Sequence, residues 1–153
     1  MNFLENKTEL KNLLKKLDGK EKPEFGLMTP QHMIEHLALS VKFSNGKSPQ
    51  KLVLQTEMAE KIKLYITQTE NEMKPGFKTP ILPTDKLLDL NFENIEEAIN
   101  NLFTEIKDFE QFKKKYPNAK PINPVMGEMQ WGDWAIFHNK HIRHHLKQFK
   151  LIE

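Results

Sequence analysis

Apolar side chains recur every three or four residues through much of this 153-residue chain, and this period constrains the fold more than any other feature. The clearest case is the segment 93–115, whose stripe consists of Ile95, Ala98, Ile99, Leu102, Ile106 and Phe109. Such spacing gives an α-helix one apolar face. Because no segment shows a convincing alternation of apolar and polar residues, the sequence predicts an all-α fold.

Four further helices are predicted. A short first helix covers residues 8–17, and a second has Thr29 as its N-cap, Pro30 at its first position and an end near Asn45 and Gly46. Two more cover residues 49–69 and 130–149. The inward positions expected in the helix at 49–69 are Leu52, Met58, Ile62, Tyr65 and Ile66. Those expected in the last helix are Trp131, Trp134, Ile142 and Phe149.

Two proline-containing stretches, 70–89 and 116–128, separate the later helices, and each contains three prolines. The first of these loops, 70–89, is unusually long for a compact domain, and loops of that length often cover or shape a binding site. Four long helices, a short leading one and long crossovers predict a four-helix bundle that forms one domain over residues 1–153.

Composition excludes several functional classes. The chain has no cysteine, so metal ligands must be nitrogen or oxygen atoms and any thiol must come from a substrate. Its 23 basic and 21 acidic residues are interspersed, without the basic stripe that nucleic-acid binding requires. No apolar run approaches the ~20 residues of a membrane helix, and no secretory signal pattern begins the chain. We expect a cytoplasmic protein that binds neither nucleic acid nor membranes.

Four of the six histidines fall within residues 138–145. Because helical residues three or four apart share a face, His138, His141 and His145 project to one side and His144 is turned away. The other two, His32 and His36, are also four apart, and His36 borders the apolar stripe of its helix.

A single histidine on an apolar face usually hydrogen-bonds to the backbone or to water. With three on one face, the free-energy cost of removing a polar ring nitrogen from water recurs three times, so this explanation is weaker. A single cation satisfies several lone pairs at once. His141 and His145 can bind one ion, and His36 is the better candidate for a third ligand. Three imidazoles with one coordination position open are typical of a catalytic metal site.

Three motifs resemble the DinB/YfiT-like superfamily. Two are Thr-Pro-Gln-His-Met-Ile-Glu-His-Leu at 29–37 and His-Ile-Arg-His-His-Leu-Lys-Gln-Phe at 141–149. The third is similar to an uncharacterised subgroup of the superfamily, and it consists of Asn123, Pro124, Val125, Met126 and Gly127 followed by Trp134, Phe137, His138, Lys140 and His141.

The resemblance implies a bundle with a divalent ion, often zinc or nickel, on His36, His141 and His145. Some members of the superfamily are thiol-dependent S-transferases that use low-molecular-weight thiols, and one is an isomerase. His144 matches a non-ligand position and is expected to make a structural hydrogen bond. Gln148 follows the motif without an assigned role.

The leading hypothesis is a metal-dependent enzyme that transfers an external thiol to a small electrophile, with metal-assisted hydrolysis second. His138 is a candidate acid or base, an outer partner or an extra ligand, and Glu35 or another carboxylate is suggested to orient a ligand imidazole. The alternatives are a non-catalytic metal- or ligand-binding bundle and an interaction domain with an incidental histidine cluster. The sequence leaves a homodimer and the role of His32 open.

Overall fold

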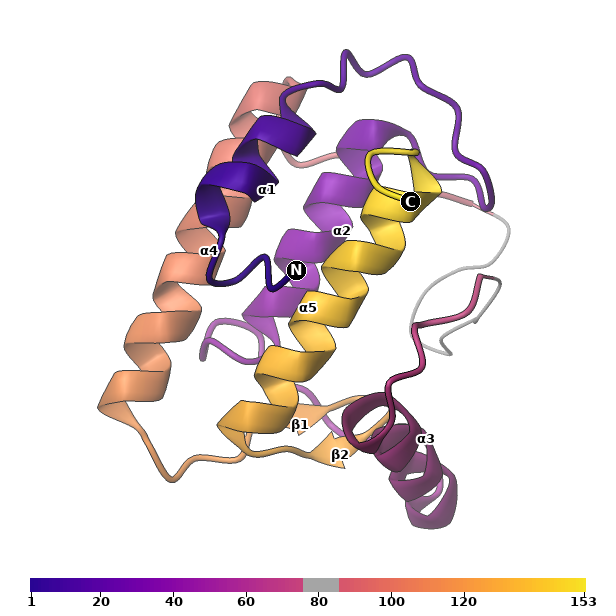
Figure 1. Ribbon diagram of the computed structural model, residues 1–153. Helices are drawn as coiled ribbons and strands as arrows, with labels where there is room; N and C mark the ends of the chain where they lie inside the picture. Colours follow the sequence, from indigo (N-terminus) through magenta and orange to yellow (C-terminus); the bar gives the residue numbers. More distant parts are fainter. Residues whose placement is uncertain (76–85) are drawn as a thin grey trace.

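The computed structural model describes residues 1–75 and 86–153, and this part of the chain is mostly helical, as predicted (Figure 1). The described helices are α1 (Lys7–Leu14), α2 (Pro30–Lys42), α3 (Thr56–Gln68), α4 (Ile95–Lys115) and α5 (Trp131–Gln148). Two short antiparallel strands, β1 (Ile122–Asn123) and β2 (Gly127–Glu128), lie between α4 and α5. None of these helices is long and apolar enough to cross a membrane.

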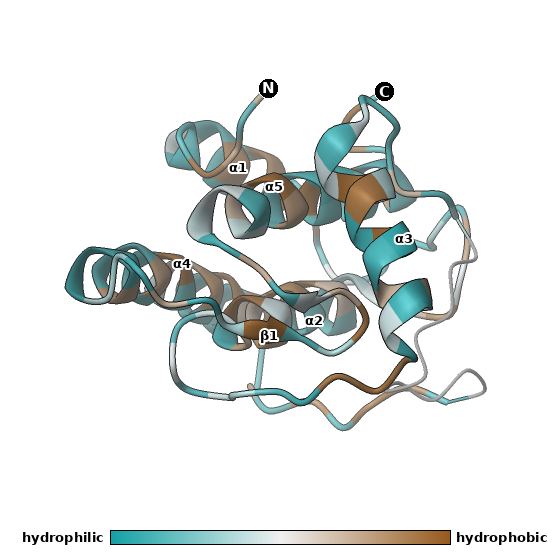
Figure 2. Ribbon diagram, turned by 90° about the horizontal axis from the view of Figure 1, so that it is seen from below, coloured by the Kyte–Doolittle hydropathy of each residue, from teal (hydrophilic) through white to brown (hydrophobic). Residues whose placement is uncertain are grey.

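The arrangement places α2, α4 and α5 side by side, with α1 beside α4 and with α3 at one end of α5 next to β2 (Figure 1). Each helix carries hydrophobic and hydrophilic residues on different sides, as amphipathic packing requires (Figure 2). The centre of the core contains Leu10, Leu14, Ile34, Leu37, Leu102, Ile106, Trp134, Ile142 and Leu146. α2 and α5 therefore face each other across a gap that is filled by side chains.

α2 begins where the sequence predicts it, because two start signals coincide there. The Thr29 hydroxyl oxygen accepts a hydrogen bond from the backbone N–H of His32, at 3.2 Å between oxygen and nitrogen. Pro30 occupies the first helical position, where its missing N–H leaves no hydrogen bond unmade. α2 ends at Lys42, slightly before the predicted Asn45 and Gly46.

A close approach of α4 explains the glycine that follows α2. Gly46 has a φ of +86°, and a Cβ atom there would lie 2.5 Å from Cε2 of Phe112. The Phe112 ring has little freedom to move aside, because it packs against the rings of Tyr116 and Trp131. Position 46 therefore requires glycine for two reasons, backbone conformation and space.

We expect Gly46→Ala to lower the free energy of unfolding by about 2–4 kcal/mol, because backbone strain and overpacking add. Gly19→Ala is the matched control, since Gly19 also has a positive φ, +93°, but no atom lies within 4 Å of its Cβ position. Urea unfolding of both variants separates the two causes. Equal losses in the two variants would show that the contact with Phe112 contributes nothing.

The inward positions of the last helix are confirmed, since Trp131, Trp134, Ile142 and Phe149 are all buried. For the helix at 49–69 the prediction is wrong at Met58, which is 52% exposed. α3 begins only at Thr56 and buries Ala59, Ile66 and Thr67, a narrow strip that contacts α5 and β2. Met58 lies outside this strip.

The hairpin of β1 and β2 was not predicted from the sequence, because two residues per strand are too few to show an alternating pattern. The side-chain oxygen of Asn123 accepts hydrogen bonds from the backbone N–H groups of Val125 and Met126, at 2.9 and 3.2 Å. The indole N–H of Trp134 donates to the carbonyl of Pro121 at 3.1 Å. The hairpin segment is thereby fixed to the beginning of α5.

The expectation that residues 70–89 cover a binding site falls partly outside the described residues, which omit 76–85 and with them Pro80 and Pro83. The end of α3 and the residues that follow it, up to Asn71, are held to α5 by Lys140. Its ammonium donates to the carbonyls of Ile66, Thr69 and Asn71, at 2.7, 2.7 and 2.8 Å. Lys140, a residue of the motif that ends at His141, thus connects α5 to the end of α3 and the residues after it.

Candidate metal centre

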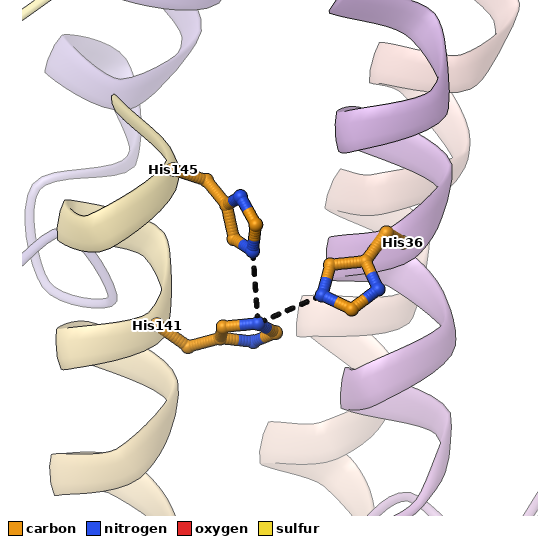
Figure 3. A group of neighbouring side chains, drawn as sticks. All are labelled: His36, His141 and His145. Atoms are coloured by element: carbon orange, nitrogen blue, oxygen red, sulfur yellow. Dashed lines mark hydrogen bonds between the residues drawn. The ribbon is translucent and has the colours of Figure 1, made fainter. Parts of the chain in front are cut away.

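Three histidines from two helices converge in the space between α2 and α5. His36 comes from α2 and His141 and His145 come from α5, and their rings point toward one another across the space between the helices (Figure 3). The Nε2 atom of His141 lies 2.9 Å from Nε2 of His36 and 3.1 Å from Nε2 of His145. These are the three residues that the sequence analysis selected as metal ligands.

The surrounding rings fix the direction of the imidazoles. The Phe137 ring lies nearly parallel to the His141 ring, with an interplanar angle of 17° and 5.3 Å between centroids. The His36 ring meets the rings of His141 and His145 edge-on, at centroid separations of 4.8 Å. His141 and His145 are buried and His36 is partly buried. The edge-on geometry brings ring nitrogens, rather than ring faces, to the common centre.

Burial keeps these imidazoles neutral. It lowers the pKa of His36 from 6.5 to about 4, with a smaller contribution from the charge of His144. It also lowers the pKa of His141 and of His145 well below 6.5, and the charges of the neighbouring histidines lower both further. At neutral pH all three side chains are therefore uncharged imidazoles, the form that binds metal ions.

The hydrogen-bond pattern of the cluster fits a cation. Nδ1 of His145 lies 2.8 Å from the Gln148 carbonyl oxygen Oε1, so Nδ1 carries the hydrogen and Nε2 presents a lone pair. Two short nitrogen–nitrogen contacts then meet at Nε2 of His141, and only one of them can be a well-formed hydrogen bond, because Nε2 of His145 has no hydrogen to donate. Four-coordinate zinc with nitrogens about 2.0–2.1 Å away separates neighbouring ligand atoms by roughly 3.3 Å. The two contacts at Nε2 of His141, 2.9 and 3.1 Å, are close to that value, and the three candidate ligand atoms lie within 4.8 Å of one another. Neutral imidazole donors suit zinc and nickel.

His138 lies one turn before His141 but outside the cluster. Its Nε2 atom is 2.8 Å from the hydroxyl oxygen of Ser44, and that hydroxyl donates to the carbonyl of Val41 at 3.0 Å. Nε2 of His138 is therefore the donor to Ser44, and the bond connects α5 to the end of α2. Burial lowers the pKa of His138 to about 3. Its role as an acid or base stays a prediction.

The remaining two histidines make hydrogen bonds outside the cluster. His144 makes the structural hydrogen bond expected of it, with Nδ1 3.2 Å from the carbonyl oxygen of Met73. Nδ1 of His32 lies 2.6 Å from the Thr29 hydroxyl at the start of α2. Neither ring belongs to the group of His36, His141 and His145.

The orienting role suggested for Glu35 is not what the structure shows. One of its carboxylate oxygens accepts from the backbone N–H of Asn91 at 2.6 Å and the other from the Gln31 amide at 3.0 Å, which holds the segment before α4 against α2. The polar side chain that hydrogen-bonds to a clustered imidazole, that of His145, is the amide of Gln148. The position of Gln148, one turn after His145, was the only sequence signal for this contact.

Two cavities lie near α3. The larger, about 410 Å³, has a polar lining that includes Lys63, Lys120 and Asp133 and none of the three clustered histidines. The smaller, about 250 Å³, is mostly apolar. Its lining residues are Lys61, Ile62, Tyr65, Ile66, Met73, Lys74, Val125, Met126 and Phe137. Because the Phe137 ring stacks on His141, the smaller cavity adjoins the cluster through a single ring.

Comparison with known proteins gives one match. A family model with the description "Protein of unknown function (DUF1569)" matches residues 6–151, which include every residue of the histidine cluster. No curated protein and no solved structure matches the chain. The comparisons thus show the family of the chain but no activity for it.

Proposed function

We propose that this chain, which belongs to the DUF1569 family, binds one divalent metal ion through Nε2 of His36, His141 and His145. The observation that carries the proposal is the convergence of three neutral imidazole nitrogens in a buried place, where too few hydrogens exist to satisfy their lone pairs. Zinc and nickel are the proposed ions. When bound, such an ion with a coordination position open supplies Lewis acidity.

The bundle type belongs to the same proposal. We take α2, α3, α4 and α5 as the four helices of a DinB/YfiT-type bundle and α1 as the additional N-terminal helix. In support, the proposed ligands lie on the first and the last of these four helices, as the resemblance to that superfamily implies.

A metal-dependent enzyme is the function that we favour, with transfer of a low-molecular-weight thiol to a small electrophile first and hydrolysis second. The apolar cavity beside Phe137 supports a small-molecule substrate. Because the chain has no cysteine, a thiol nucleophile would have to be external. Phe137 would separate that substrate from His141. For His138 to move a proton, its Nε2–H would have to leave Ser44.

Metal binding is tested with protein that was purified without a histidine tag and stripped with a chelator. Titration with Zn²⁺ and with Ni²⁺ is expected to give one strongly bound ion per chain. His32→Gln is the control, because His32 lies outside the cluster, and it should bind equally well. Failure of the untagged wild-type chain to bind either ion rejects the proposal.

Catalysis is tested separately with the metal-loaded protein. Several thiols are each paired with a small electrophile, and the loss of free thiol is followed. Turnover that disappears on metal removal supports the transferase, whereas release of acid from an ester or amide supports the hydrolase. A protein that binds the ion but is inactive in both assays favours the second candidate, a non-catalytic metal-binding bundle.

A further inference from the structure

We infer that Gln148 is a positioning residue that fixes the tautomer of His145, so that the Nε2 lone pair of this imidazole faces the histidine cluster. The inference rests on the metal site proposed above, because a lone pair at that place matters for binding an ion. Gln148 is not one of the three proposed ligands, and its side chain connects the cluster to the segment before α2.

The orientation of the Gln148 amide is determined by its other partner. Its Nε2 donates to the backbone carbonyl of Phe25 at 2.8 Å, so its Oε1 faces Nδ1 of His145, also at 2.8 Å. A flipped amide would place two carbonyl oxygens against each other and an NH₂ group against His145. Because Gln148 is only 3% exposed, water cannot easily replace either partner. The acceptor at His145 is therefore an oxygen.

The tautomer of His145 follows from that acceptor. An imidazole that donates from Nδ1 has no hydrogen on Nε2, and Nε2 is the atom that lies 3.1 Å from Nε2 of His141. An Nε2–H tautomer would direct a hydrogen at the cluster and could not bind an ion through that nitrogen. Gln148 therefore holds His145 in its ligand form before any ion arrives, and hydrogen bonds of this kind commonly tune metal affinity.

Residues 24–26 hold Gln148 from the opposite side. The backbone N–H of Glu24 donates to the backbone carbonyl of Gln148 at 2.8 Å. Gly26, with a φ of +77°, approaches so closely that a Cβ atom would lie 3.2 Å from Nε2 of Gln148. The amide is thus confined between this segment and α5, which gives it one position from which to act on His145.

The tautomer can be measured without metal. Long-range ¹H–¹⁵N spectra of the metal-free protein at pH 8 are expected to show His145 protonated at Nδ1 in the wild type and in Gln148→Glu, which keeps an acceptor oxygen. Gln148→Leu, which removes the acceptor, should shift His145 toward the Nε2–H form. Phe25→Ala is the control, because it keeps the backbone carbonyl and should leave the tautomer unchanged.

Metal affinity gives the second readout. Gln148→Leu is expected to bind Zn²⁺ about 10- to 100-fold more weakly than the wild type, whereas Gln148→Glu should keep wild-type affinity or exceed it. Gln148→Glu also loses the hydrogen bond to the carbonyl of Phe25, which is expected to lower the thermal stability. A less stable variant that keeps its Zn²⁺ affinity would show that the affinity depends on the acceptor for His145 and not on the bond to Phe25. Equal affinity of Gln148→Leu and the wild type would overturn the inference.

The two proposals fail in distinguishable ways. A wild-type chain that binds no Zn²⁺ rejects the metal site, and the spectra of the metal-free protein still test the tautomer. If Gln148→Leu does not fold, the wild-type spectrum decides alone, since His145 found in the Nε2–H form contradicts the role of Gln148.

Discussion

His141→Ala is expected to abolish specific metal binding. The Kd for Zn²⁺ should rise by well over the ten- to hundredfold increase that follows the loss of a hydrogen-bond partner of a ligand. Nε2 of His141 contacts both of the other proposed ligand nitrogens, so its removal leaves one imidazole on α2 and one on α5 with nothing between them. Competition with a chromophoric chelator measures the Kd, and circular dichroism measures the helical content, which should change little.

The matched control is His144→Ala. His144 is only three residues from His141 on the same helix, but it is half-buried and bonds to the carbonyl of Met73 instead of the cluster. It should bind Zn²⁺ like the wild type. Unfolding of His141→Ala together with loss of the ion would indicate a structural ion, which favours the non-catalytic candidate. Unchanged affinity in His141→Ala would contradict the site.

Acid is expected to destabilise the metal-free protein steeply below pH 6.5. Burial lowers the pKa of His36 to about 4 and that of His138 to about 3, whereas in the unfolded chain both groups titrate near 6.5. The unfolded state therefore binds more protons in this window, and stability falls with pH by about 1.4 kcal/mol per pH unit for each such histidine. The combined loss, of the order of 5–10 kcal/mol by pH 3, is comparable to the whole stability of a typical domain.

Urea unfolding at a series of pH values checks this prediction. Stability should be at its plateau above pH 6.5 and fall as the pH approaches 4, and the metal-free protein should be largely unfolded by pH 3. His36→Gln removes one of the titrating groups and should reduce the slope. Added Zn²⁺ should shift the loss to lower pH, because protons must displace the ion. Constant stability between pH 6.5 and 4 would contradict the burial of these imidazoles as neutral groups.

Much of the site could be predicted from the sequence because helical spacing is a local property. His141 and His145 had to share a face of α5 once that segment was helical, and Thr29 and Pro30 fixed the start of the helix that carries His36. That α2 and α5 would lie against each other was a hypothesis, drawn from the histidines that both segments carry and from the resemblance to a superfamily of bundles, and the structure shows the two helices in contact.

Contacts made by irregular segments could not be predicted in this way. The Gln148 amide donates to the backbone carbonyl of Phe25, and every residue has such a carbonyl, so the sequence does not indicate this partner. The contact of Glu35 could not be predicted for a similar reason, because its partner is the backbone N–H of Asn91. Met58 was misplaced because α3 contacts its neighbours over a strip too narrow to be deduced from an apolar pattern.

The most direct test of the central claim is anomalous diffraction from crystals of the zinc-loaded protein, collected at the zinc edge. The proposed site predicts one strong peak per chain, with Nε2 of His36, His141 and His145 each about 2.0–2.1 Å from it. The absence of a peak between α2 and α5, or a peak held by other residues, would contradict it.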